Sequence, residues 1–356
     1  MKYKFLTVFD TDSATDGVIF RGIENLFKIV FKEFEFKSVI RTENLKIRDE
    51  FIRIARFDEF DEKELVEDRF YPQEVFDAVV VPGTPWIWDQ FHKSVKYKNL
   101  IKMIEMHRYA PVIFLGIGSC VSKGNEESIM REEEKKEINY LFSKGTVVCR
   151  DSLAYSALSN ADVEANFLPC PSYFAYDEEE FKNHFDRQDL SFVYFDPYDS
   201  ISSISWKNKE EDYKRFCEIV ENIKKKDNVK IYSAINSSDK KIVDKYSKFV
   251  LLKNSSDTIN LIKNSKKLIS VRVHCTAAAY SNGVDSAVIP IDSRARTLTD
   301  FGCFEINNLE DLEYFFREYR NKFDKNLLSF YKREYLKILN KLKSEIDIRN
   351  KVLCRN

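Results

Sequence analysis

Short runs of β-branched and aromatic residues alternate along this chain with segments in which apolar residues recur every three or four positions. The first pattern is typical of buried strands and the second of amphipathic helices. Strands that alternate with helices form a parallel sheet covered by helices, so the pattern predicts an α/β fold. The length of 356 residues exceeds what one hydrophobic core usually spans and favours two domains.

The first half of the chain contains four expected strands with helices between them. The segment from Glu33 to Phe70 fits neither period, so its structure stays open, and an insertion near a cleft is one interpretation. The strands are expected at Lys4–Phe9, Asp77–Val81, Pro111–Leu115 and Thr146–Cys149, and the main helices at Gly17–Phe31, Asn99–His107 and Arg131–Phe142.

A second series of strands and helices follows a loop rich in proline and acidic residues, between Pro169 and about Gln188. We therefore predict domains at 1–185 and 186–308, and a helical tail at 309–356 that packs on a domain surface. The later strands are expected at Ser191–Phe195, Val229–Ala234, Phe249–Leu251, Lys267–Val271 and Ser286–Ile289. The apolar residues of the tail, spaced by three and four, are Leu328, Tyr331, Tyr335, Leu339, Leu342 and Ile346.

Composition and charge narrow the functional class. With 44% hydrophobic and 14% aromatic residues, the chain has the composition of a folded protein rather than a disordered one. Its 57 basic and 58 acidic residues leave a formal net charge of -1, so no overall field favours nucleic acid or an anionic membrane. Nucleic acid is therefore not expected as a partner.

The N-terminal run MKYKFLTVFD is too short for a signal peptide and is interpreted as the first strand. No stretch approaches the roughly 18 apolar residues of a membrane span. The seven cysteines are scattered and odd in number, which favours free thiols in a reducing cytosol, and no CxxC pair indicates a zinc site. We therefore expect a cytoplasmic protein without a transmembrane segment or a bound metal.

Ligands of open parallel sheets bind beyond the carboxyl ends of the strands, so the residues there are the candidates. The polar loop 10–17 enters the first helix, whose free amides could hold an anion, and Asp16 is its candidate residue. The alternative is helix capping by Thr15 or Asp16. After the second strand, Gly83 permits a sharp turn and Thr84 and Trp86 follow, so that an aromatic ring could face a sugar. The alternative is that Trp86 and Trp88 belong to the core or to a hinge.

Two further strand ends carry glycine and arginine. Gly116-Ile-Gly118-Ser119 would let a ligand or another backbone approach closely, although this is not the full dinucleotide fingerprint. Arg150 follows the next strand, just before a helix that Asp151 or Ser152 could cap, and its alternative role is a salt bridge.

Arg272 and His274 repeat this arrangement in the second domain. In an extended strand, residues two apart point to the same side, so a cation and a titratable imidazole would share one pocket wall. The small residues from Thr276 to Ala279 would start a closely packed helix. The alternative for His274 is a ring satisfied by backbone groups.

Taken together, these motifs resemble the polysaccharide pyruvyl transferase family over roughly residues 1 to 300. Asp16 stands where the family has an early aspartate, although here it follows threonine instead of glycine, and Cys275 replaces the glycine after the family's histidine. The other matching segments are the glycine-ended strands at Gly83 and Gly118, the turn Arg150-Asp-Ser152, the proline segment Cys170-Pro-Ser172, and Arg272-Val-His274 followed by Gly283 and Ile289-Pro290.

The resemblance implies two Rossmann-like domains that face each other across a cleft, as in GT-B glycosyltransferases. It also implies transfer of a pyruvyl group, as a cyclic ketal, from phosphoenolpyruvate to a sugar of a polysaccharide or its precursor. Phosphoenolpyruvate is a co-substrate, and no cofactor or metal is expected. Arg150 and Arg272 would bind its oxyanions from opposite cleft walls, because guanidinium groups bind such groups through two parallel hydrogen bonds.

His274 would then move the proton and Asp16 would position an acceptor hydroxyl. The expected substrate-binding residues are Gly83, Thr84, Trp86, Gly118, Ser119 and Ser152. Two alternatives stay open, a glycosyltransferase whose Arg272 and His274 bind the phosphate of a nucleotide-sugar, and a non-catalytic glycan-related binding protein. Whether the acceptor is lipid-linked, nucleotide-linked or polymeric also stays open.

Overall fold

The structure is a computed structural model of the 356-residue chain. It describes residues 2–8, 13–38, 75–122, 124–176, 187, 189–194, 209–226, 228–234, 246 and 248–353. No helix among these residues is long and apolar enough to cross a membrane.

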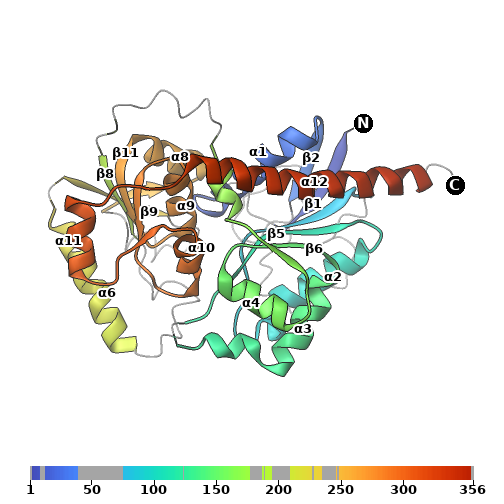
Figure 1. The fold of residues 1–356 in the computed structure, drawn as a ribbon, viewed down its shortest axis with the longest axis horizontal. Coiled ribbons are helices and arrows are strands. Elements are labelled where there is room, and N and C mark those ends of the chain that lie inside the picture. Colours follow the sequence, from blue (N-terminus) through green and yellow to red (C-terminus); the bar gives the residue numbers. More distant parts are fainter. Residues whose placement is uncertain are drawn as a thin grey trace.

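The first domain is built on a parallel sheet of order β2-β1-β3-β5-β6-β7, with the short strand β4 paired to β5 (Figure 1). The central strands are nearly continuous apolar runs because helices cover both faces of the sheet. The strands are β1 Tyr3–Thr7, β2 Phe34–Ser38, β3 Ala78–Pro82, β4 Pro85–Ile87, β5 Val112–Ser119, β6 Gly145–Cys149 and β7 Ala165–Phe167. The helices are α1 Asp16–Val30, α2 Val95–Met106, α3 Glu132–Phe142 and α4 Ser152–Asn160.

The second domain contains a six-stranded parallel sheet of order β10-β9-β8-β11-β12-β13. With β8 as its first strand in sequence, this is the strand order of a Rossmann fold. The strands are β8 Asp189–Tyr194, β9 Val229–Ala234, β10 Val250–Leu252, β11 Ser265–Ser270, β12 Asp285–Val288 and β13 Phe304–Glu305. The helices are α6 Lys209–Lys224, α8 Ser255–Asn264, α9 Val273–Ser281, α10 Arg296–Thr299 and α11 Leu309–Arg317.

The predicted α/β class with two Rossmann-like sheets is confirmed, and most strand bounds agree within a few residues. The predicted end of the third strand at Leu115 is wrong, because β5 continues to Ser119 and pairs there with β4. Part of the segment that fitted neither period forms β2, whose Phe34 and Phe36 contact Phe5 of β1. The rest, 39–74, lies outside the described residues.

The last helix, α12 (Lys325–Leu353), crosses back from the second domain and runs along the first (Figure 1). Tyr335, Leu339, Leu342 and Ile346 are buried in the same cluster as the aromatic residues of β1 and α1. The apolar spacing of the tail is therefore confirmed as a packing face. The domain bounds at 185 and 308 stay predictions, since the tail joins the two halves.

The 3-10 helix η5 (Pro171–Phe174) connects the domains and is held between α1 and α9. Pro171 fits there because Gly22 and Gly116 have no side chain. A Cβ at Gly22 would lie 1.9 Å from the carbonyl oxygen of Pro171, and one at Gly116, whose φ is +81°, would lie 2.5 Å from its Cδ. This packing fixes the position of Cys170, the residue before η5.

Candidate functional site

His274 lies in the first turn of α9, at the point where the chain leaves β11. The prediction that Arg272 and His274 share an extended strand is wrong, because β11 ends at Ser270. The hydroxyl of Ser270 accepts a hydrogen bond from the amide of Arg272 (2.7 Å) and donates one to its carbonyl (3.1 Å). This local turn starts the helix and leaves its first amides beside the imidazole.

The charges of three arginines act on the imidazole of His274, which is 7% exposed. Burial is the main reason that its pKa lies well below its usual value, and the charges of Arg150, Arg294 and Arg272 lower the pKa further. The imidazole is therefore neutral at neutral pH. The two domains both contribute, since Arg150 follows β6 and the other two arginines follow β11 and β12.

Arg150 is fully buried, so it does not line an open cleft wall as predicted. Its Nη1 donates to the carbonyl oxygen of Gly83 (2.5 Å). Its Nε and Nη2 have no hydrogen-bond partner among the described residues. The guanidinium fits because a Cβ at Gly118 would lie 2.5 Å from Nε. A buried cation with open donors is unfavourable on its own and favours an anionic partner.

Arg272 and Arg294 are held from the second domain. Nη2 of Arg272 donates to the carbonyl of Ala234 at the end of β9 (3.2 Å). Burial, followed by the charge of Arg294, lowers the pKa of Arg272 to about 10, which leaves it charged at neutral pH. Arg294 makes a forked pair with Asp292, with Nε–Oδ1 and Nη2–Oδ2 distances of 2.8 and 2.6 Å.

Asp16 is the first residue of α1, and its charge acts on both Arg272 and Arg294. The helix is capped by Ser13, whose hydroxyl accepts from the amides of Asp16 and Gly17 (2.9 and 3.2 Å). The charges of Arg150 and Arg272 thus act on His274, and that of Asp16 acts on Arg272. The roles predicted for these residues in catalysis stay predictions.

Ser119 links the two domains. Its hydroxyl donates to Oδ1 of Asp151 (2.9 Å) and lies 2.9 Å from the hydroxyl of Ser293. Ser293 and Val121 exchange two further hydrogen bonds, each of 2.8 Å. The adjoining Ser152 also contacts the second domain, since its amide donates to Asp300 (2.6 Å). Both predicted substrate-binding serines therefore take part in domain contacts.

The remaining predicted residues are packing positions. Trp86 is 2% exposed and lies in the core of the first domain, with its Nε1 donating to the carbonyl of Pro82 (3.3 Å). The alternative interpretation of Trp86 as a core residue therefore fits the structure. Gly83 allows close approach, since a Cβ there would lie 2.7 Å from the carbonyl oxygen of Gly116. The hydroxyl of Thr84 is buried and has no partner among the described residues.

Sequence reasoning did not single out Asp292 and Arg294. Both lie in the segment that follows β12, which ends at Val288, so attention to the whole loop after a strand would have found them. Within the described part of the chain, no group of three His, Cys, Asp or Glu side chains could hold a metal ion.

Comparison with known families decides the assignment. The family model described as polysaccharide pyruvyl transferase matches residues 17–293, which is more than half of the chain and includes the ends of the described strands from β2 to β12. The chain belongs to the polysaccharide pyruvyl transferase family. No curated protein matches it by sequence.

Solved structures show how this pyruvyl transferase family member is built. The S. aureus MnaA–UDP co-structure aligns with a TM-score of 0.59 at 12% identity, and the aligned region covers 97% of each chain. A UDP-N-acetylglucosamine 2-epimerase from Rickettsia bellii has a TM-score of 0.56 at 14% identity and covers 100% of both chains. The epimerase from Methanocaldococcus jannaschii, bound to UDP-GlcNAc and UDP, has a TM-score of 0.53 at 12% identity, covering 96% of this chain and 100% of its own. The fold is therefore GT-B-like.

Proposed function

We propose that the chain transfers a pyruvyl group from phosphoenolpyruvate to two hydroxyls of a sugar, in a polysaccharide or a precursor of one. The observation that carries the proposal is the set of three guanidinium groups around a neutral His274, at the facing ends of the two sheets. Because the donor is an intracellular metabolite, we place the reaction in the cytoplasm. No resident cofactor or metal is proposed.

The charges suit this donor. Phosphoenolpyruvate carries a carboxylate and a phosphate, and guanidinium groups bind both through paired hydrogen bonds. Arg272 and the amides at the start of α9 would bind one oxyanion. The Nε and Nη2 of Arg150, which have no hydrogen-bond partner among the described residues, would bind the other. Arg294 stays paired with Asp292 and supplies fixed positive charge nearby.

The proposed reaction begins when C3 of the enolpyruvyl group takes up a proton and becomes a methyl group, while C2 becomes cationic. The oxygen of one acceptor hydroxyl bonds to C2, and the bond from C2 to the phosphate oxygen breaks. A second hydroxyl of the same sugar then bonds to C2 and closes the ketal. The two hydroxyl protons balance the proton added at C3 and the proton carried by the leaving phosphate. Fixed guanidinium charge stabilises that leaving anion.

His274 is the proposed proton carrier. Without donor its imidazole is neutral and can accept a proton from an acceptor hydroxyl. A bound anion would offset the repulsion by Arg150, Arg272 and Arg294, so donor binding raises the pKa of His274 and lets it give the proton back. Asp16 would orient the acceptor hydroxyl, since its charge acts on the same group of arginines.

A glycosyltransferase that uses a nucleotide-sugar is the second candidate. The observation that favours it is the GT-B-like fold, which this chain shares with structures bound to UDP. On this alternative Arg272 and the α9 amides bind a nucleotide phosphate. A binding protein without turnover is the third possibility for the same fold.

Turnover tests these proposals. We expect release of inorganic phosphate from phosphoenolpyruvate only when an acceptor sugar is present, and a fall of roughly a hundredfold or more in His274→Gln. A cooperative thermal unfolding transition of that variant, at the wild-type melting temperature, would show that the fold is intact. Phosphate release by His274→Gln at the wild-type rate would remove His274 from the mechanism.

A further inference from the structure

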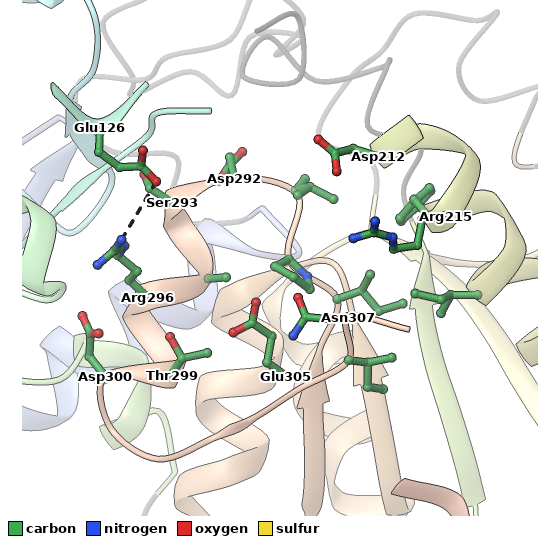
Figure 2. Close-up of a pocket in the computed structure, with 17 residues that line it drawn as sticks. Glu126, Asp212, Arg215, Asp292, Ser293, Arg296, Thr299, Asp300, Glu305 and Asn307 are labelled. Carbon is green, nitrogen blue, oxygen red and sulfur yellow. Dashed lines mark ion pairs between the residues drawn. The ribbon is translucent and has the colours of Figure 1, made fainter. Parts of the chain in front are cut away.

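A cavity of about 260 Å³ lies beyond the carboxyl ends of β12 and β13, next to the residues that hold Arg294 (Figure 2). Helix α6 forms one wall, the segment from Ile289 to Ser293 forms another, and Glu126 of the first domain closes a third side. None of the predicted site residues lines it. Its size is slightly below the roughly 300–1,000 Å³ of sites for drug-sized ligands, which suits a single sugar ring.

The lining of the cavity combines apolar and polar side chains, and α6 contributes both kinds. The apolar surface includes the ring of Phe216 and the side chains of Ile219, Ile289 and Ile306. Figure 2 shows Arg215 reaching from α6 towards the centre, above Asn307 and Glu305. A sugar ring suits such a mixed lining, because its C–H faces pack on apolar or aromatic groups and its hydroxyls bond to carboxylates and amides.

Charge excludes the donor from this cavity. Five carboxyl groups line it against two guanidinium groups. Arg294, which lies outside the lining, neutralises Asp292, and the remaining excess of carboxylates would still repel a ligand with a phosphate and a carboxylate. The carboxyl groups are Glu126, Asp212, Asp292, Asp300 and Glu305, and the guanidinium groups are Arg215 and Arg296. Metal binding is not favoured either, because no three ligating side chains converge among the described residues.

We infer that this cavity binds the acceptor as one neutral sugar ring, beside the donor site rather than within it. The inference rests on the proposed function, whose donor site it adjoins. The connection is the segment from Asp292 to Arg294, which lines the cavity with Asp292 and Ser293 and carries Arg294, whose charge acts on His274. A sugar held here would present its hydroxyls near the donor.

Sugar binding can be measured without any donor. Saturation-transfer NMR on the full chain would use three probes, the methyl glycosides of galactose, glucose and mannose. At least one is expected to bind wild type, and Asp212→Asn and Asn307→Ala are each expected to weaken it about fivefold, as for one lost hydrogen bond. Glu218→Gln is the matched control, because Glu218 is exposed on the same helix and does not line the cavity.

Thermal stabilisation by phosphoenolpyruvate, measured without sugar, separates this inference from the proposed function. It should be the same in wild type, Asp212→Asn and Asn307→Ala. The inference is overturned if none of the probes binds wild type, if both variants bind as wild type does, or if both lose phosphoenolpyruvate binding. Absence of phosphoenolpyruvate binding in wild type would instead contradict the proposed function, while the sugar probes still decide whether the cavity binds a sugar.

Discussion

The sulfur of Cys170 lies 3.7 Å from Nδ1 of His274. The same sulfur lies 3.8 Å from Nη1 of Arg150, so one buried thiol contacts both the imidazole and a guanidinium. A contact at Nδ1 fixes the ring orientation and leaves Nε2 as the nitrogen available to a substrate. Pro171, held between Gly22 and Gly116, keeps the thiol in place.

Replacing Cys170 tests this orienting contact. Cys170→Ser keeps a group that can hydrogen-bond to Nδ1, whereas Cys170→Val fills similar space without one. We expect Cys170→Val to lower kcat about five- to tenfold and to shift the pH profile of kcat, as for one lost hydrogen bond, with Cys170→Ser close to wild type. Equal kcat values and equal pH profiles for both variants would show that the thiol only packs.

The low pKa of His274 also makes stability depend on pH. Its folded pKa lies below the unfolded value of about 6.5, so below that pH the unfolded chain binds a proton that the folded chain does not. His274 therefore makes its full contribution to the free energy of unfolding above about pH 6.5. As the pH is lowered, this contribution falls by up to about 1.4 kcal/mol per pH unit.

Denaturant unfolding at about pH 7.5 and about pH 5.5 measures this dependence. His274→Gln, which cannot titrate, should lose about 1 kcal/mol less than wild type between the two pH values. The same loss in both proteins would mean that His274 is not held neutral by its surroundings. Other acid-sensitive groups, including His107 with its lowered pKa, affect both proteins equally.

Gly118→Ala should act through Arg150. The new Cβ would lie 2.5 Å from Nε and 2.9 Å from Nη2, so the guanidinium has to move. We expect the Kd for phosphoenolpyruvate to rise by about tenfold or more, as for the loss of a hydrogen bond to a charged group. Isothermal titration calorimetry measures this Kd. An unchanged Kd would indicate that Nε and Nη2 of Arg150 do not contact phosphoenolpyruvate.

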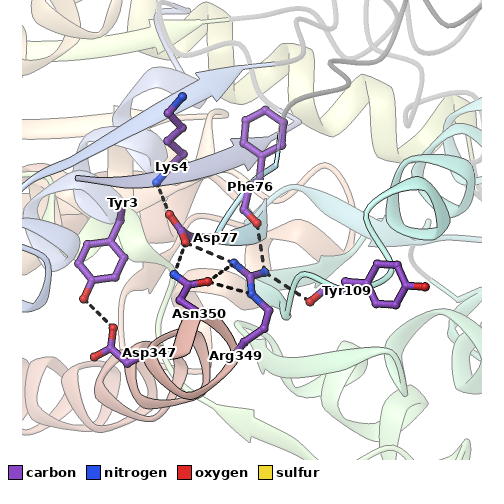
Figure 3. Close-up of polar contacts among 8 residues, drawn as sticks. All are labelled: Tyr3, Lys4, Phe76, Asp77, Tyr109, Asp347, Arg349 and Asn350. Atoms are coloured by element: carbon purple, nitrogen blue, oxygen red, sulfur yellow. Dashed lines mark hydrogen bonds and ion pairs between the residues drawn. The ribbon is translucent and has the colours of Figure 1, made fainter. Parts of the chain in front are cut away.

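The end of α12 is anchored to the first domain through Asp77 (Figure 3). Asp77 accepts hydrogen bonds from the amide of Lys4 (2.8 Å), Nη2 of Arg349 (3.3 Å) and Nδ2 of Asn350 (2.8 Å). Nη1 of Arg349 also donates to the carbonyl of Phe76 (3.1 Å). The group is only partly buried, with 16% of each charged side chain exposed.

Arg349→Ala should therefore lower the free energy of unfolding by about 1–2 kcal/mol, because it leaves Asp77 with fewer donors. Lys351→Ala, on an exposed residue of the same helix, is the control and should change it by less than about 0.5 kcal/mol. Denaturant unfolding compares the two variants. A loss in Lys351→Ala as large as that in Arg349→Ala would contradict the anchoring role of Asp77.

The sequence predicts the parallel-sheet architecture because strands such as Ala78–Pro82 are apolar runs with clear limits. It does not show that β5 continues to Ser119, since that extension depends on β4, which pairs with it from another part of the chain. Strand β2 is missed for a similar reason, because its alternating Phe34 and Phe36 gain their burial from β1 and α1.

Attention to strand ends singles out Arg150, Arg272 and His274, whose charges interact in the structure, and Asp16, whose charge acts on Arg272. It does not give their geometry. The helical position of His274 depends on a hydrogen-bonded turn at Ser270, and the burial of Arg150 depends on Gly118. The contact between Gly118 and Arg150 joins residues distant in sequence, which no local pattern reveals.

Thermal unfolding with phosphoenolpyruvate tests the central claim most directly, with wild type compared with Arg272→Ala and with UDP as the competing ligand. A ligand at a hundred times its Kd stabilises the fold by about 2.7 kcal/mol. We predict that phosphoenolpyruvate raises the melting temperature of wild type and not that of Arg272→Ala. Stabilisation of wild type by UDP alone would contradict the pyruvyl transfer account and support a nucleotide-sugar donor.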